Sequence, residues 1–156
     1  MEYAMSLVTV LLVTGIILIL LLVMIGIFVL TRSYRKNCDV KELDEIEGHD
    51  FEYYCAELLK KRGFVDVVVT KGSGDYGVDV LAEKDGVTYG IQCKAYATPV
   101  GVKAVQEAYA GKEYYDRMVG AVLTNQYFTK PAVEAAKKLK ILLWDRGYLD
   151  SMIEEE

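Results

Sequence analysis

The stretch that decides the fold is GDYGVDVLAEKDGVTYGIQCK, residues 74–94. Two short runs of alternating apolar and polar residues, Val78–Glu83 and Val87–Lys94, flank an Asp85-Gly86 pair. Asp-Gly is a dipeptide that two-residue hairpin turns prefer, because both central residues of such turns need a positive φ. The sequence therefore predicts a β-hairpin with its turn at this pair.

A turn at this position sets the register of the hairpin. Asp79 lies opposite Gln92, and because side chains alternate along a strand, Asp79, Gln92 and Lys94 share one face. The other face carries the apolar residues Val78, Val80, Ile91 and Cys93. The apolar face is explained by a core, whereas the polar face has two explanations.

One explanation of the polar face is a metal site. A carboxylate and an amide oxygen are two of the oxygen ligands that Mg²⁺ prefers, and a lysine beside them can orient a water or stabilise charge on a phosphate. The other explanation is a surface ion pair between Asp79 and Lys94, worth at most about 1 kcal/mol, with Gln92 solvated. Spacing alone favours neither.

A second acid is expected from the preceding helix. Residues 50–63 place apolar side chains at 51, 54, 55, 58 and 59, the spacing of one buried stripe. Glu52 falls at the edge of that stripe, where it is able to face a site, whereas Glu57 points farther away and is expected in solvent.

The rest of the chain alternates between strand and helix patterns. After the first helix we expect a strand at 65–70 and the hairpin, joined by a glycine-rich turn at 72–74. Further helices are expected at 100–115, 129–140 and 148–153, and strands at 119–124 and 141–144. This order predicts a mixed α/β fold, with an antiparallel meander first and helical crossovers later. The helix at 100–115 is expected to bury Val102, Val105 and Tyr109, and its Gln106 is either a neighbour of the polar face or, as the pattern favours, in solvent.

The N-terminal region differs sharply in composition. Residues Leu7–Leu30 form a run of 24 residues without a charge, long enough to span a bilayer as a helix. Arg32, Arg35 and Lys36 follow the run and no Lys or Arg precedes it, which predicts an outside N-terminus and a cytoplasmic C-terminal domain. Residues 1–30 are thus expected to be a single transmembrane helix, in contact with membrane lipid through residues 7–30.

A charged connector at 31–48 and a compact domain at 49–156 complete the predicted organisation. That domain contains 14 Lys and Arg against 17 Asp and Glu, a formal net charge of −3, which argues mildly against a large nucleic-acid footprint. The three cysteines, Cys38, Cys55 and Cys93, form no CxxC or Cys/His cluster, so they do not indicate a zinc site.

Five ordered segments resemble the catalytic domain of Mrr-type restriction endonucleases, in the PD-(D/E)xK nuclease superfamily. They are GHDFEYYCAELLKKRGF (48–64), KGSGDYGVDVLAEKDG (71–86), IQCKAY (91–96), VLTNQYFTKPAVEAA (122–136) and ILLWDRGYL (141–149). The resemblance implies a restriction-endonuclease-like mixed sheet flanked by helices. It also implies an active site made of Glu52, Asp79, Gln92 and Lys94.

The reaction that the resemblance implies is hydrolysis of DNA phosphodiester bonds with Mg²⁺, or Mn²⁺ as the alternative ion. Asp79, Glu52 and Gln92 would hold the metal, and Lys94 would orient the water. The expected substrate is duplex DNA, with restriction of foreign DNA as the expected role and a homodimer as a candidate arrangement. One alternative is a catalytically silent membrane adaptor that binds DNA or a protein partner through the same fold. Another is a nuclease that acts on junctions or RNA, since a fold does not fix the substrate.

Overall fold

The computed structural model describes residues 13–27, 43, 46, 48–71 and 76–154 of the chain. It divides into two compact units, Met1–Asp39 and Val40–Glu156. In the first unit, residues 13–27 are helical and expose their apolar side chains. Among the described residues, no helix combines the length and the apolar character needed to cross a membrane. The predicted span at 7–30 reaches past this helix, since 7–12 and 28–30 lie outside the described residues.

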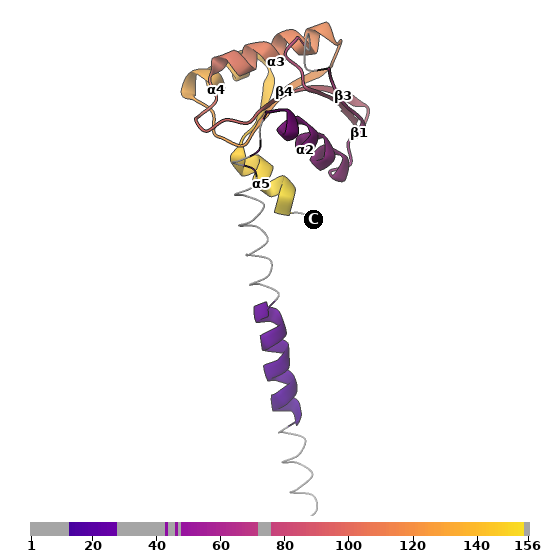
Figure 1. The fold of residues 1–156 in the computed structure, drawn as a ribbon, viewed down its shortest axis with the longest axis vertical. Coiled ribbons are helices and arrows are strands. Elements are labelled where there is room, and N and C mark those ends of the chain that lie inside the picture. Colours follow the sequence, from indigo (N-terminus) through magenta and orange to yellow (C-terminus); the bar gives the residue numbers. More distant parts are fainter. Residues whose placement is uncertain (1–12, 28–42, 44–45, 47, 72–75, 155–156) are drawn as a thin grey trace, which may run out of the picture. The chain divides into compact units, whose positions relative to one another are not determined.

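The second unit contains one mixed sheet and four helices among its described residues (Figure 1). Its strands lie in the order β1-β2-β3-β4-β5; β1, β2 and β3 are antiparallel, and β3, β4 and β5 are parallel. Along the chain the elements are α2 (Gly48–Lys61), β1 (Val65–Val69), β2 (Val80–Lys84), β3 (Val87–Lys94), α3 (Val102–Tyr114), β4 (Val119–Thr124), α4 (Lys130–Leu139), β5 (Ile141–Trp144) and α5 (Arg146–Glu154). The predicted fold, a meander followed by helical crossovers, is confirmed.

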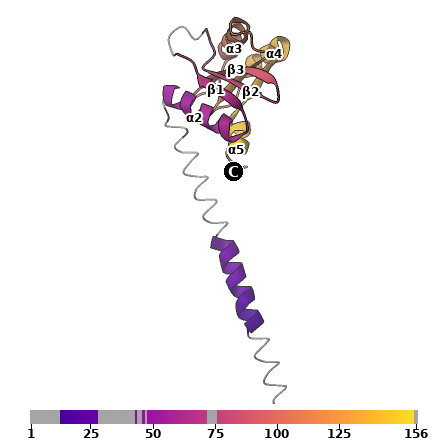
Figure 2. The same ribbon diagram turned by 90° about the vertical axis from the view of Figure 1, so that its right-hand side faces the viewer.

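Helices cover both faces of the sheet, and each face has its own core (Figures 1 and 2). Helices α2 and α5 pack on one face around Phe51, Leu59 and Leu149. Helices α3 and α4 pack on the other around Val105 and Ala136. Strand β4 contributes to both cores, as its continuous apolar run predicts for a strand buried on both faces.

The hairpin adopts the predicted register. Lys84 pairs with Val87 and Val80 with Ile91, and the turn residues Asp85 and Gly86 have φ values of 53° and 78°. These positive values are the ones that the Asp-Gly turn requires. The local sequence of the turn therefore determines which residues of β2 and β3 lie opposite each other.

The prediction that Val78 shares a face with Val80 is wrong. Val80 and Ile91 belong to the core beneath α2, whereas Val78 packs towards α3, where a methyl group on Gly111 would lie 2.6 Å from Val78 Cγ2. Strand β2 begins only at Val80, so strand alternation does not extend back to Val78.

Two further elements depart from the expected pattern. In β1 the register shifts between Val65 and Val68 and Asp66 has a φ of 50°, so Val65 is exposed while Val67 and Val69 pack on the core. In α3 the sequence predicted a buried face of Val102, Val105 and Tyr109. The buried residues are instead Ala104, Val105, Ala108 and Gly111, because small side chains let this helix approach the sheet and the loop beneath it closely.

The segment before α2 also contributes to the core. Leu43 and Ile46, which the sequence assigned to the polar connector, pack into the core beneath α2, and Leu43 is only 1% exposed. Residues 31–42 of that connector lie outside the described residues. The packed domain therefore begins earlier than residue 49.

Candidate active site

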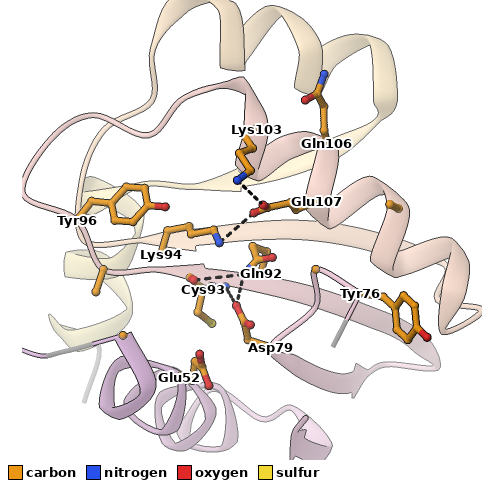
Figure 3. Close-up of a pocket in the computed structure, with 14 residues that line it drawn as sticks. Glu52, Tyr76, Asp79, Gln92, Cys93, Lys94, Tyr96, Lys103, Gln106 and Glu107 are labelled. Carbon is orange, nitrogen blue, oxygen red and sulfur yellow. Dashed lines mark hydrogen bonds and ion pairs between the residues drawn. The ribbon is translucent and has the colours of Figure 1, made fainter. Parts of the chain in front are cut away.

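A pocket of about 640 Å³ lies where α2, the start of β2, the end of β3 and α3 meet (Figure 3). Glu52 comes from α2, Asp79 directly precedes β2, and Gln92 and Lys94 come from β3. All four line the pocket. The structure thus brings together the four residues that the sequence analysis selected.

Asp79 is held at the floor of this pocket and is 5% exposed. Its Oδ2 accepts a hydrogen bond from the backbone N–H of Cys93 at 2.6 Å and a short one from Nε2 of Gln92. Its own N–H donates to Ile91 at 2.9 Å, and its carbonyl accepts from Thr70 N at 2.8 Å. Both strands that flank Asp79 therefore fix its backbone, and β3 fixes its carboxylate.

Gln92 faces Asp79 through its amide nitrogen and is itself buried. The same Nε2 also donates to the carbonyl of Cys93 at 3.4 Å. In this arrangement the amide orients the Asp79 carboxylate. The amide oxygen, which the sequence analysis considered as a metal ligand, would need a rotation of the amide to face Asp79.

Lys94 pairs with an acid that the sequence analysis did not select. Its Nζ lies 3.0 Å from Oε2 of Glu107 on α3, and Nζ of Lys103 lies 3.6 Å from Oε1 of the same carboxylate. Burial lowers the pKa of Lys94, but the hydrogen bond and the charge of Glu107 outweigh it, so the pKa is raised above 10.5. Lys94 is thus held in its charged form at neutral pH.

Glu107 escaped prediction because the wrong stripe of α3 was taken as buried. On the stripe that is buried, Ala104 lies three residues before Glu107 and Gly111 four residues after it, so Glu107 borders the packed face. The signal in the sequence is the spacing of small residues at 104, 108 and 111, which marks close approach to a neighbour. Gln106, considered as a neighbour of the site, lines the pocket but is exposed.

Glu52 occupies the edge position that the helix pattern predicted. Its side chain is 18% exposed, and its Oε2 lies 3.0 Å from Nδ1 of His49 one turn earlier. The Glu52 carboxylate thus lines the pocket while a neighbour on the same helix holds it. Figure 3 shows it on α2, across the pocket from α3.

Cys93 and Cys55 are buried and free, as expected for core residues. A hydrogen bond with Cys55, burial, and the nearby charges of Asp79 and Glu52 all raise the pKa of the Cys93 thiol well above 9.0. The thiol is therefore neutral, and Cys93 packs in the same core as Cys55 while also lining the pocket.

The donors in the pocket fit a hard divalent cation. Among the described residues no group of three or more His, Cys, Asp and Glu could hold a metal ion. Mg²⁺ does not require such a group, because it commonly takes one or two carboxylates and keeps several waters. Glu52 and Asp79 supply two carboxylates, and Gln92 supplies an amide, in the same pocket.

Comparison with protein families gives a match over most of the chain. The model Mrr_cat, described as a restriction endonuclease, matches residues 43–153. The match begins at Leu43, a residue that is buried in the core beneath α2. A comparison with curated proteins gave no match.

Three solved structures share the fold. The protein of unknown function AF1548 is 24% identical with a TM-score of 0.57, and the alignment covers 67% of this chain and 64% of that one. The MspJI restriction endonuclease, solved with a 27-mer oligonucleotide, is 17% identical with a TM-score of 0.54, and the alignment covers 79% of this chain and 31% of that one. The DNA modification-dependent restriction endonuclease AspBHI is 15% identical with a TM-score of 0.56, and the alignment covers 78% of this chain and 35% of that one. The chain thus spans under two thirds of the first and about a third of each of the others.

Proposed function

The chain belongs to the restriction endonuclease family Mrr_cat, and we propose on that premise that it is a metal-dependent endonuclease that hydrolyses DNA phosphodiester bonds. One observation carries the proposal: Glu52, Asp79, Gln92 and Lys94 come from separate parts of the sequence and line one pocket. Two acids, one of them buried, are able to hold a divalent cation, and a charged lysine in the same cavity is able to stabilise the charge that develops when a phosphodiester is hydrolysed.

Each residue has a distinct task in this proposal. Asp79 and Glu52 would hold Mg²⁺, or Mn²⁺ in its place, with Gln92 orienting Asp79 or adding its amide oxygen. A bound divalent cation would offset negative charge on the phosphate as the bond breaks. Lys94 is protonated, so it acts as a cation that orients the attacking water and the phosphate. Glu107 holds the Lys94 ammonium in the pocket.

We further propose that residues 7–30 tether the nuclease to the cell membrane, with the domain cytoplasmic and positioned to meet foreign DNA. The uncharged run and the basic residues that follow it support this placement. Membrane fractionation of the full chain tests the tether, with a chain that starts at residue 40 as the control. Recovery of both chains in the soluble fraction would contradict it.

The nuclease activity is tested on supercoiled plasmid with the full chain and Mg²⁺. We expect nicking by the natural sequence, at least a hundredfold less by Asp79→Asn and Lys94→Ala, and none with EDTA. Asp85→Asn serves as the matched control, because Asp85 lies in the hairpin turn, where asparagine adopts the same positive φ. Plasmid binding without any nicking would instead favour the adaptor.

A further inference from the structure

Tyr76 occupies an unusual position at the edge of the pocket. Its ring is 57% exposed, and it lines the same cavity as Asp79. Its φ is 51°, in the left-handed region that glycine, asparagine and aspartate favour and that is strained for a bulky residue. A strained conformation persists only where the surrounding structure imposes it, and such positions concentrate at functional sites.

The packing around Tyr76 explains how this conformation is imposed. At Gly77, the next residue, a Cβ would lie 2.6 Å from the carbonyl oxygen of Glu107, and at Gly111 a Cβ would lie 2.8 Å from the carbonyl oxygen of Tyr76. The backbone of Tyr76 and Gly77 therefore lies directly on α3, without room for a side chain between them. This contact fixes the position from which the Tyr76 ring projects.

A second tyrosine supports the ring of Tyr76. The rings of Tyr76 and Tyr114 are stacked, with centroids 3.7 Å apart and planes 20° apart, and Tyr115 lies edge-on to Tyr114 at 5.0 Å. Tyr114 is itself 56% exposed. The pair is thus a preformed aromatic surface in solvent rather than part of a core.

The surroundings of this pair indicate what it contacts. Figure 3 shows Tyr76 and Tyr96 on opposite sides of the group formed by Asp79 and Lys94. Tyr96 is 48% exposed, and its backbone N–H is held at 2.9 Å by Oδ1 of the buried Asn125. Two ammonium groups, those of Lys94 and Lys103, lie between the two rings in Figure 3 and share the single carboxylate of Glu107, which leaves one positive charge over. Cations flanked by exposed aromatic rings suit a nucleic-acid strand, whose phosphates and bases alternate.

We propose that the stacked pair Tyr76–Tyr114 binds an unpaired nucleobase next to the phosphate that is cut. This inference rests on the proposed nuclease function and makes DNA with unpaired nucleotides at the cleavage site, such as a gap, a bulge or a single strand, the preferred substrate over fully paired DNA. In an intact duplex the bases are stacked on one another, and a ring outside the helix reaches a base only after the base leaves the stack. The cost of unpairing is lowest where the base has no partner.

The first test compares cleavage of matched substrates by the full chain with Mg²⁺. The natural sequence should cut a duplex with a three-nucleotide gap at least about tenfold faster than the fully paired duplex, and Tyr76→Leu should remove most of that difference. Tyr76→Phe should keep it, because the ring remains. The matched control is Tyr148→Leu, since Tyr148 is also exposed and stacked, on Trp144, but lies outside the pocket.

The second test measures stacking without cleavage. The gap carries 2-aminopurine, whose fluorescence falls on stacking, and the metal is left out. We expect quenching by the natural sequence and by Tyr76→Phe, and loss of quenching with Tyr76→Leu and Tyr114→Leu. Equal cleavage of gapped and paired duplex, or quenching that survives Tyr76→Leu, would overturn the inference while leaving the nuclease proposal intact. Absence of cleavage of every substrate would instead defeat the nuclease proposal.

Discussion

The ammonium of Lys94 at the end of β3 lies 3.0 Å from the carboxylate of Glu107 in the middle of α3. This ion pair joins the strand that carries two of the candidate site residues to the helix that covers it. It is only partly exposed, with side-chain exposures of 19% for Lys94 and 31% for Glu107. Burial lowers the pKa of Lys94, whereas the hydrogen bond and the charge of Glu107 raise it.

Replacing Glu107 by glutamine should therefore weaken both the placement and the charge of Lys94. We expect Glu107→Gln to reduce the cleavage rate roughly ten- to a hundredfold at pH 7.5, because the ammonium loses its anchor. The pKa of Lys94 should fall, because burial is no longer offset. The alkaline limb of the pH–rate profile should then move to lower pH.

Glu113→Gln is the control for this change. Glu113 is on the same helix and also pairs with a lysine, Lys112 at 2.6 Å, but its side chain is 59% exposed and lies outside the pocket. The Glu113→Gln substitution should leave both the cleavage rate and the pH–rate profile unchanged. On the alkaline side, the stabilisation by the pair between Lys94 and Glu107 is fully present up to about pH 10.5 and is lost as the pH rises through the raised pKa of Lys94. An unshifted alkaline limb in Glu107→Gln would contradict the assigned role.

Gln92→Glu should destabilise the fold when no metal is present. The change replaces the N–H donor that faces Asp79 by a second buried carboxylate, and we expect a loss of about 2 kcal/mol in the free energy of unfolding. Added Mg²⁺ should raise the melting temperature of this variant more than that of the natural chain. The loss should shrink as the pH falls and one carboxylate takes up a proton.

The same chemical change at Gln106 provides the comparison. Gln106 also lines the pocket but is exposed, so Gln106→Glu should alter the free energy of unfolding by less than about 0.5 kcal/mol. Thermal denaturation with EDTA and with Mg²⁺ measures both variants. Equal stability of Gln92→Glu and the natural chain in EDTA would show that the amide does not orient Asp79.

Glu52→Gln should raise the Mg²⁺ concentration that gives half-maximal cleavage by about tenfold, because one of the two carboxylates in the pocket is lost. Glu57→Gln, on the same helix, should have no effect, since Glu57 is exposed and bonded to Lys60 at 2.7 Å. Titration of Mg²⁺ at saturating DNA measures the difference. If the cleavage rate of Glu52→Gln stays low even at high Mg²⁺ concentration, Glu52 has a role other than binding the metal.

Gly111→Ala should disrupt the loop that precedes Asp79. The added methyl would lie 2.6 Å from Val78 Cγ2 and 2.8 Å from the Tyr76 carbonyl oxygen, so the loop or α3 must move. We expect a loss of about 1–3 kcal/mol in the free energy of unfolding, despite the better helix propensity of alanine. Cleavage should fall with it.

Gly147→Ala is the corresponding control in α5. At Gly147 the nearest atom to an added Cβ is Asp145 Oδ1 at an ordinary 3.4 Å, so the substitution should be neutral or stabilise by up to about 1 kcal/mol. Urea denaturation measures both glycine variants. A Gly111→Ala protein as stable and as active as the natural chain would show that the loop does not depend on this contact.

The hairpin was predictable because its determinants are local. Asp85 and Gly86 need a positive φ, the turn they form fixes the pairing of β2 with β3, and that pairing places Asp79 beside Gln92. The cap of α4 is equally local, since Thr129 accepts from Ala132 N with Pro131 in the first turn. Such signals depend on residues within a few positions of one another.

The position of Val78 and the buried face of α3 depended on packing between distant segments. Val78 lies outside the strand, so no alternation rule applied to it. The packed face of α3 consists mainly of alanine and glycine, and such small residues stand out little in a pattern of hydrophobic spacing. Glu107 was missed for that reason, because its approach to Lys94 follows from how closely the helix packs.

The sequence by itself determined the order of the elements and the register of the hairpin, since turn chemistry and residue spacing specify them, and its resemblance to a nuclease family selected Glu52, Asp79, Gln92 and Lys94 as candidate site residues. Only the tertiary structure decided that Glu107 holds Lys94 and that Tyr76 projects beside Asp79. Both relationships arise where α3, at Gly111, lies against the loop that contains Gly77. Contacts of that kind depend on the distance between two packed surfaces, which no single segment of sequence specifies.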